Sequence, residues 1–328
     1  MNLKKLFRPK SLALVGGYWA DFVYDGNKTI GYQGKVWHIN PSRKSSKAKK
    51  YYKNIKDLPE VPDCVYLAVS RDQTVKLIKD IADIGVGGTV CLASRFSELN
   101  SKEGTNKTNE LIRNAGKMPF LGPNCYGFIN YLDRISVWSD QVAGKPTKKG
   151  VAIICQSGTI GNTISFNNRS LPIGYIISLG NQSQITIEDS INYALDDKRV
   201  TAIGIYAESF TNTEKLIEVF KKSRLKKIPI ALVKVGRSKT ASKTILTHTG
   251  SLSGKEDIYD SLFQRMGVAR CNTLGELCEI LKLLHTHGAL NNDKISIMGP
   301  SGGDMAMIGD VAETLSLNFG KIPTKIKN

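Results

Sequence analysis

Short runs of β-branched residues alternate with segments of helical period along most of this 328-residue sequence. Such alternation is typical of βαβ units, which build parallel sheets covered by helices on both faces. The first predicted strands are Ser11–Val15, Lys35–Ile39, Cys64–Val69, Gly88–Leu92 and Phe120–Gly122, with helices over Thr74–Ile84 and Thr105–Lys117. A second series comprises Val151–Cys155, Gly174–Ser178, Ala202–Tyr206, Ile230–Lys234 and a short run near Val268. The sequence therefore predicts an α/β fold with two doubly wound domains.

The stretch GKPTKKG at 144–150 separates the two series. We expect one domain over residues 1–145 and a second, of flavodoxin-like appearance, over residues 146–290. A further strand is predicted at Lys294–Met298 and is followed by the turn GPSGG. Since one strand and one helix do not make a domain, residues 291–328 either dock on the second domain or begin a further α/β domain.

Composition favours a cytoplasmic protein with reduced thiols. No run of about 18 apolar residues is present, and the N-terminus MNLKKLFRPK lacks the apolar stretch of a secretory signal. None of the six cysteines forms a C-x-x-C pair. We therefore expect neither disulfides nor a zinc site.

The formal net charge of +17 raises the possibility of nucleic-acid binding. Residues 41–56 carry seven Lys or Arg, no acid, and two tyrosines that can stack on bases. The sequence holds no helix-turn-helix, zinc-finger or RNA-binding signature. A solvated lysine-rich surface is the ordinary alternative, so nucleic-acid binding is the minor interpretation.

Two features of the first domain predict a nucleotide site. Gly16 and Gly17 follow the first strand directly, where free backbone N–H groups can hold a diphosphate. The second strand ends HINPSRK instead of in the Asp or Glu that binds the ribose of NAD. A nucleotide with a phosphorylated ribose fits this end, which means coenzyme A or NADP. A solvated basic loop remains the alternative.

Two loops predict a phosphate or thioester site at strand ends. The loop LGPNCYG at 121–127 presents Asn124, whose amide can bind a thioester or phosphate oxygen, and Cys125, which we interpret as a small packed residue. The run ICQSGTIGNTI predicts a strand, a turn and a helix that starts at Ser157, Gly158 and Thr159. Helix N-termini bind phosphate, although ordinary helix capping explains the same residues.

His248 lies in the run THTGSLSG at 247–254, among small hydroxyl residues and glycines that include Gly250. Hydroxyls and backbone N–H groups can bind phosphoryl oxygens, and a neutral imidazole is a competent nucleophile, so we interpret His248 as a phosphoryl carrier. Glu208 follows another predicted strand and can fix the imidazole tautomer through a hydrogen bond. The alternatives are a polar loop histidine and a solvated glutamate.

Together these motifs resemble the CoA-ligase module of the nucleoside-diphosphate-forming acyl-CoA synthetases, which include ADP-forming acetyl-CoA synthetase and, more distantly, the succinyl-CoA synthetase alpha subunit. The resemblance covers nearly the whole chain. It is carried, in the family's order, by LFRPKSLALVGG, HINPS, LGPNCYGFIN, ICQSGTIGNTI, SLGNQSQITIEDSINYALDD, VKVGRSKTASKTILTHTGSLSG and GPSGG.

The resemblance implies a Rossmann-like first domain that binds CoA and a flavodoxin-like domain that carries the phosphohistidine His248, supported by Glu208. It implies an acid-thiol ligase in an oligomer, with ATP or ADP and Mg²⁺ bound only on an ATP-grasp beta subunit or C-terminal ATP-grasp domain. Residues 291–328 would begin the family's third domain. The residues implied near CoA are Gly16, Gly17, Asn40, Pro41, Ser42, Arg43 and Ser70.

The chain departs from the family in two places. The segment Tyr18–Gln33 carries aromatic residues in place of a small glycine-bearing turn and a longer helix, and Ser70 stands where the family usually has proline. One rival interpretation is a CoA- or acyl-CoA-binding regulatory module without catalysis. The presence of both His248 and Glu208 argues against it. An NADP-dependent reductase is another, but no hydride-transfer constellation accompanies the basic strand end.

Overall fold

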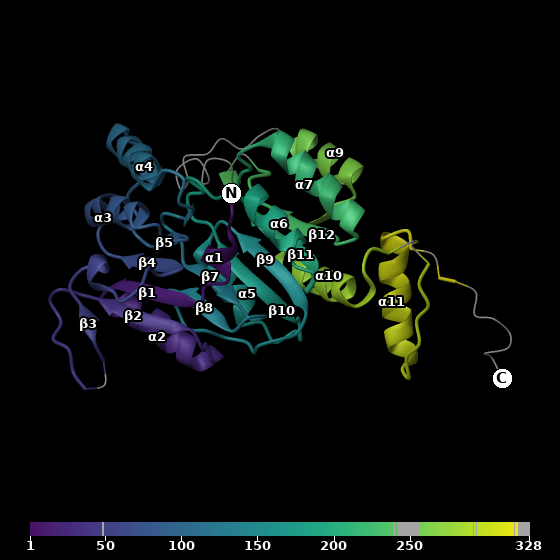
Figure 1. Cartoon of the computed structure of the whole chain (residues 1–328). Helices are drawn as coiled ribbons and strands as arrows, with labels where there is room; N and C mark the ends of the chain where they lie inside the picture. Colours follow the sequence, from purple (N-terminus) through teal and green to yellow (C-terminus); the bar gives the residue numbers. More distant parts are fainter. Residues whose placement is uncertain are drawn as a thin grey trace. The chain divides into compact units, whose positions relative to one another are not determined.

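The computed structural model describes residues 1–47, 49–238, 240–241, 256–290, 292, 294–317 and 319–320. The chain divides by its contacts into two compact units, Met1–Gly288 and Ala289–Asn328. The first unit holds both large sheets and is shown in purple to green in Figure 1.

Among the described residues the first sheet has six strands, all parallel, in the order β3-β2-β1-β4-β5-β6. Its strands are β1 (Ser11–Gly16), β2 (Lys35–Ile39), β3 (Tyr51–Tyr52), β4 (Cys64–Ala68), β5 (Thr89–Cys91) and β6 (Phe120–Leu121). Each of the five predicted strands forms, and β2 has the predicted bounds. The strand order reverses between β1 and β4, where doubly wound sheets bind ligands at their carboxyl edge.

The helices of this sheet are α2 (Tyr18–Ile30), α3 (Arg71–Asp83) and α4 (Lys102–Ala115), with 3₁₀ turns η1 (Ile55–Asp57) and η2 (Ser97–Leu99). The two predicted helices correspond to α3 and α4, but each begins about one turn earlier than predicted. Their starts are set by the caps Ser70 and Ser101, whose hydroxyls accept hydrogen bonds from the backbone N–H of Gln73 and Gly104.

Among the described residues the second sheet has seven strands in the order β13-β12-β11-β9-β10-β7-β8. They are β7 (Gly127–Asn130), β8 (Ile135–Trp138), β9 (Gly150–Cys155), β10 (Ile173–Ser178), β11 (Val200–Ala207), β12 (Ile230–Lys234) and β13 (Ala269–Cys271). The hairpin β7–β8 was not predicted. It pairs antiparallel with β10, so residues that precede the linker at 144–150 complete the second sheet.

Helices cover both faces of the second sheet (Figure 1). They are α5 (Gly158–Ser165), α6 (Ile187–Leu195), α7 (Thr213–Lys226), α9 (Glu256–Met266) and α10 (Leu274–His287). Alternate residues of β9 serve the two faces: Ala152 and Ile154 belong to the core cluster that contains residues of α6, α7 and α9, whereas Val151 and Ile153 belong to the cluster that contains residues of α5 and α10. This architecture agrees with the predicted flavodoxin-like arrangement.

One hydrophobic cluster joins the two sheets. The short helix α1 (Lys4–Phe7) buries Phe7 completely, and its ring lies 5.2 Å from Phe128 of β7 and 4.9 Å from Tyr193 of α6, measured between ring centroids. The same cluster contains Leu12 of β1 and Ile177 of β10. The two sheets therefore share a packed core.

The second unit contains α11 (Gly302–Thr314), whose cap Ser301 is the third residue of the predicted GPSGG turn, so that the last two glycines of the motif are already helical. The strand predicted at Lys294–Met298 is wrong for the described residues, because only an isolated bridge between Ile295 and Phe319 forms there. A strand needs a partner, and one bridge does not extend into a ladder.

Candidate functional site

A cavity of about 790 Å³ opens at the carboxyl edge of β1, β2 and β4. It contains the predicted residues Gly16, Gly17, Asn40, Pro41 and Ser42. Its remaining lining residues come from the strand ends, η1 and α3: Val15, Ile39, Lys53, Asn54, Ile55, Lys56, Ala68, Val69, Gln73, Lys76, Leu77, Asp80 and Ile81.

Gly16 makes the turn beneath this cavity. Its φ of +131° is a conformation that side chains rarely adopt, and a Cβ there would lie 2.4 Å from the carbonyl oxygen of Ala68. The amide of Asn40 donates to the Gly16 carbonyl at 2.8 Å and its Oδ1 accepts from the Ser42 N–H at 3.0 Å. Asn40 thereby ties the end of β2 to the glycine turn.

Arg43 lies outside the cavity lining. Its guanidinium donates to Asp21 at 2.7 Å and to the hydroxyl of Tyr51 at 3.1 Å, and Lys49 donates to the other oxygen of Asp21 at 2.7 Å. Burial alone would raise the pKa of Asp21, but these two cations lower it. The basic loop after β2 is thus fastened to α2 by one carboxylate.

Three lysines line the cavity, whereas Arg43 does not: Lys53, Lys56 and Lys76. These lysines were not predicted from the sequence as CoA ligands. Lys56 pairs with Asp80 at 3.0 Å, whereas among the described residues no carboxylate oxygen lies within 4.0 Å of the ammonium nitrogen of Lys53 or Lys76. Lys53 lies in the basic stretch at 41–56, but Lys76 gave no local signal because lysine is ordinary on a helix surface.

The remaining predicted neighbours of CoA lie beside the cavity. Ser70 caps α3 and is exposed, and the lining passes through Val69 and Gln73 on either side of it. Helix α2 starts immediately after Gly17, and its first residues Tyr18 and Trp19 are exposed and outside the lining.

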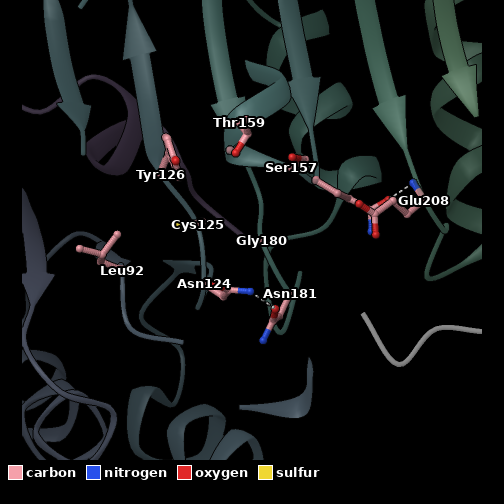
Figure 2. A pocket seen from close by; sticks show the side chains of 11 residues that line it. Leu92, Asn124, Cys125, Tyr126, Ser157, Thr159, Gly180, Asn181 and Glu208 are labelled. Atoms are coloured by element: carbon pink, nitrogen blue, oxygen red, sulfur yellow. Dashed lines mark hydrogen bonds between the residues drawn. The ribbon is translucent and has the colours of Figure 1, made fainter. Parts of the chain in front are cut away.

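A second, smaller cavity of about 180 Å³ lies between the two sheets' carboxyl edges (Figure 2). It brings together Asn124, Ser157, Gly158, Thr159 and Glu208, all of which were singled out from sequence. The other lining residues are Leu92, Cys125, Tyr126, Gln156, Gly180 and Asn181. The predicted residues His248 and Gly250 lie outside the described residues.

The start of α5 provides the polar floor of this cavity. Ser157 is the N-cap, with its hydroxyl accepting from the Ile160 N–H at 3.4 Å, and the first turn of α5 contains no acidic residue. Helix starts carry partial positive charge and unsatisfied N–H groups. The cavity therefore suits an anion.

Gln156 places Glu208 beside the helix start. Its Oε1 accepts from the backbone N–H of Glu208 and, at 2.9 Å, from that of Ser209, while its Nε2 donates to the Ser209 hydroxyl at 3.4 Å. Glu208 ends up 6% exposed at the end of β11. Sequence reasoning missed Gln156, although it stands in the motif that was identified.

On the side of the cavity opposite the start of α5, the loops that contain Asn124 and Gly180 pack closely against each other. Gly180 has φ +55°, and a Cβ there would lie 2.3 Å from the carbonyl oxygens of Pro123 and Asn124. The backbone of Asn124 has φ +58°. Its side-chain amide donates to Asn181 Oδ1 at 3.3 Å, and the backbone N–H of Asn181 donates to the Pro123 carbonyl at 3.0 Å. These contacts aim two amide side chains at the cavity (Figure 2).

Cys125 is 1% exposed, and burial raises the pKa of its thiol to about 12. A thiol in that state is a poor nucleophile at neutral pH. This agrees with its interpretation as a packed residue. All six cysteines are buried and free.

The described residues contain no group of three or more His, Cys, Asp or Glu side chains suited to a metal ion. None of the helices that they form has the length and apolar character of a membrane span.

Two family models match the chain. A CoA-binding domain matches residues 14–131, and a succinyl-CoA ligase-like flavodoxin domain matches residues 148–284. The first match covers nearly all of the first sheet and extends to β7 of the second sheet, whereas the second match covers the second sheet from β9 to β13.

Two relatives and one solved structure extend the comparison. The ADP-forming acetate–CoA ligase of Methanocaldococcus jannaschii is 31% identical over 100% of this chain and 47% of its own length. A trans-feruloyl-CoA synthase from an unknown prokaryotic organism is 28% identical over 97% of this chain and 46% of its own length. The acetyl-coenzyme A synthetase 1 of Candidatus Korarchaeum cryptofilum, solved with phosphate and ADP, superposes with a TM-score of 0.88 at 25% identity, covering 98% of this chain and 71% of that chain.

The chain thus spans about half the length of these two curated relatives. Both family models, in this order, and a match over essentially the whole chain agree with the resemblance carried by the sequence motifs. The chain belongs to the family of the NDP-forming acyl-CoA synthetases and corresponds to their CoA-ligase module.

Proposed function

We propose that this chain interconverts acyl-CoA plus phosphate with acyl phosphate plus CoA, and relays the phosphoryl group through His248 to ADP. In this proposal residues 1–145 bind CoA, and residues 146–290 carry the phosphoryl-transfer site. Residues 291–328 begin a further ligase domain.

The observation that carries the proposal is the placement of two cavities along one sheet edge. The large cavity lies at the ends of β2, β1 and β4, and the small cavity begins at Leu92 and Asn124, just after β5 and β6. Neighbouring strands are about 4.8 Å apart, so the cavities are separated by roughly 10–20 Å along the edge. A ligand with a nucleotide at one end and a reactive group at the end of a long arm fits this spacing.

The large cavity fits the nucleotide end of CoA. Ile39, Leu77 and Ile81 offer apolar surface to an adenine ring, and the turn at Gly16 leaves room for a diphosphate to approach the backbone. Lys53 and Lys76 supply cations for the ribose phosphate. With Arg43 held by Asp21, we propose these lysines as additional CoA ligands beside Asn40 and Ser42.

The small cavity fits the reacting end. Phosphate would sit at the start of α5, where Ser157, Gly158 and Thr159 present N–H and hydroxyl groups, and the Asn124 amide would hold the thioester oxygen. A phosphate oxygen then forms a bond to the acyl carbon while the carbon–sulfur bond breaks, and the leaving thiolate takes up a proton. In the second step an imidazole nitrogen of His248 bonds to phosphorus as the P–O bond to the carboxylate breaks, which releases the free acid.

Glu208 is proposed to hold the second ring nitrogen of His248. The Gln156 side chain fixes the backbone of Glu208 and the carboxylate lines the same cavity as the α5 start. A carboxylate hydrogen-bonded to the imidazole would set the tautomer and stabilise the positive charge that develops on the phosphorylated ring. His248 and Gly250 enter this proposal from the sequence alone.

We further propose that ADP and Mg²⁺ bind on an ATP-grasp subunit or domain that completes the enzyme in an oligomer. The match to only 47% of the Methanocaldococcus jannaschii ligase supports a further part of the machinery outside this chain.

Intact-mass analysis tests the proposal directly. The chain would be incubated with acetyl-CoA and phosphate at alkaline pH, which preserves phosphohistidine, and compared with His248→Ala and with the matched control His285→Ala. The expected result is an acid-labile gain of one phosphoryl group in the wild type and His285→Ala only. Binding of CoA without labelling by any of several small acyl-CoAs would instead support a binding module without catalysis.

A further inference from the structure

The geometry points to Tyr126 as the residue that limits the size of the acyl group, so that this site takes short aliphatic acids and rejects bulky or aromatic ones. The inference rests on the proposed function, since it names the substrate class of the same site. The relatives are named for acids as different as acetate and ferulate, so family membership leaves this open.

The ring of Tyr126 is wedged against the start of α5. A Cβ on Gly158 would lie only 2.1 Å from Cδ1 of the ring, so the ring occupies the space that a side chain at the helix start would fill. On its other side the ring packs edge-on against Trp138 at 5.4 Å between centroids. Trp138 is fully buried, so the Tyr126 ring packs against the core of the second sheet.

The backbone of Tyr126 is fixed as well. Its N–H donates to the Ser178 hydroxyl at 3.3 Å, and its carbonyl accepts from the Ser139 N–H at 3.0 Å. Both partners belong to or adjoin strands of the second sheet. The second sheet therefore fixes the backbone from which the Tyr126 ring projects, although Tyr126 is the last residue of a loop.

The lining of the small cavity divides by chemistry. Ser157, Thr159, Asn124, Asn181 and Glu208 are polar and surround the place proposed for phosphate and the thioester oxygen. Among the described lining side chains, the apolar surface comes from Leu92, Cys125 and Tyr126, and Cys125 is almost wholly buried. An acyl chain bonded to the reacting carbon thus has Tyr126 and Leu92 to contact.

The volume supports a small occupant. Pockets for drug-sized ligands measure roughly 300–1,000 Å³. This cavity, at about 180 Å³, has to hold a phosphate as well as the acyl group. With the Tyr126 ring in place, space remains for a short aliphatic chain.

The test compares phosphoryl labelling rates of the full chain with acetyl-, propionyl-, hexanoyl- and benzoyl-CoA in the presence of phosphate. We expect wild type to label fastest with the two short acyl-CoAs. Tyr126→Ala should raise the hexanoyl-to-acetyl rate ratio by about 10-fold or more, since one methylene in an apolar pocket changes rates by roughly 10–200-fold. Tyr126→Phe keeps the ring and should leave the ratio within about 2-fold of wild type on the same scale.

Leu92→Ala is a second variant, which widens the other apolar wall of the cavity and should also raise the hexanoyl-to-acetyl rate ratio. It keeps the inference testable if Tyr126→Ala lowers the melting temperature too far for assay. CoA affinity by calorimetry confirms that each variant retains the nucleotide site. Unchanged ratios in both widened variants, or wild type labelling with benzoyl-CoA as fast as with acetyl-CoA, would overturn the inference while leaving the proposed function intact. Absence of labelling with every acyl-CoA in wild type would instead reject the proposed function and the inference with it.

Discussion

Gly16 is the residue on which the shape of the large cavity depends most directly. Its φ of +131° and the 2.4 Å approach of the Ala68 carbonyl oxygen to a would-be Cβ leave no place for a side chain. The same turn forms the surface proposed to meet the CoA diphosphate. A single methyl group here should therefore affect both folding and CoA binding.

We predict that Gly16→Ala lowers the free energy of unfolding by about 1–3 kcal/mol and weakens CoA binding, because a strained backbone and a displaced strand end accompany the added Cβ. Gly85→Ala is the matched control: its φ is +83°, but no atom lies within 4 Å of the added Cβ. Chemical denaturation and calorimetry measure both effects. Equal losses in the two variants would show that the close approach to Ala68 is unimportant.

Cys125 gives a second test at this scale. Because burial raises the pKa of its thiol to about 12, we predict that Cys125→Ala keeps phosphoryl labelling and that iodoacetamide leaves Cys125 unmodified at neutral pH. Peptide mass mapping after alkylation measures the second point. Rapid alkylation that abolishes labelling would show that the thiol participates in the reaction.

Several site residues could be predicted from sequence because each follows a strand or starts a helix: Asn124, Ser157, Gly158, Thr159 and Glu208 gather in one cavity as such positions should. Tyr126 and Asn181 could not be predicted in the same way. Their positions depend on contacts between loops that are more than 50 residues apart, such as the Asn124–Asn181 hydrogen bond. The pairing of Arg43 with Asp21 across 22 residues has the same origin.

At the scale of elements, the strands with continuous apolar runs were the most predictable. Ile230–Lys234 has the predicted bounds, since a parallel strand buried on both faces leaves a clear pattern. Lys35–Ile39 also has the predicted bounds, although only its last two residues are buried. The hairpin β7–β8 was missed because its strands are four residues long and because the partner of β7 in the rest of the sheet, β10, lies more than 40 residues further along. Helix α2 covers β8, and the buried Asn27 exchanges hydrogen bonds with the backbone of Ser136.

The turn of this hairpin is held by an ion-pair network. Asp133 accepts from Arg199 at 2.8 Å, from Arg8 at 2.9 Å and from the Asn130 amide at 2.9 Å. Burial alone would raise the pKa of Asp133, but these hydrogen bonds outweigh it and lower the pKa from 3.8 to about 2. The network connects α1, the hairpin and the start of β11.

This network predicts an acid-dependent loss of stability. Since the folded-state pKa is below the unfolded value, the ionised carboxylate stabilises the fold above about pH 4, and this stabilisation is lost as the pH falls through about 2. We expect the difference in unfolding free energy between wild type and Asp133→Asn to shrink by about 2 kcal/mol between about pH 5 and about pH 2. Urea unfolding at several pH values measures it, with Asp25→Asn, on the exposed face of α2, as control. A difference independent of pH would contradict the role assigned to Asp133.

At the scale of the whole molecule, the charge of +17 has a structural explanation in part. In the densest basic stretch Arg43 and Lys49 pair with Asp21 and Lys56 pairs with Asp80, while Tyr51 is held against Arg43 and Lys49. Lys53 faces the large cavity. Much of the stretch is thus paired with carboxylates or lines the large cavity, which favours a single anionic nucleotide over a nucleic-acid backbone.

We predict that the chain alone does not complete the phosphoryl relay. Once phosphorylated, it should retain the phosphoryl group when Mg²⁺ and ADP are added, because the nucleotide site is proposed to lie on an ATP-grasp partner. Adding such a subunit from a related ligase should release the group as ATP, measured by luminescence. Formation of ATP by the isolated chain would place a nucleotide site within it.

The most direct single test is a crystal structure of this chain with CoA and phosphate. We predict adenine density between Ile39 and Leu77, the arm running past the ends of β4 and β5, phosphate at the start of α5, and the thiol in contact with the small cavity lined by Leu92 and Asn124. A nucleotide bound elsewhere, or an arm that leaves the sheet edge away from Leu92, would contradict the claim that the two cavities form one CoA-ligase site.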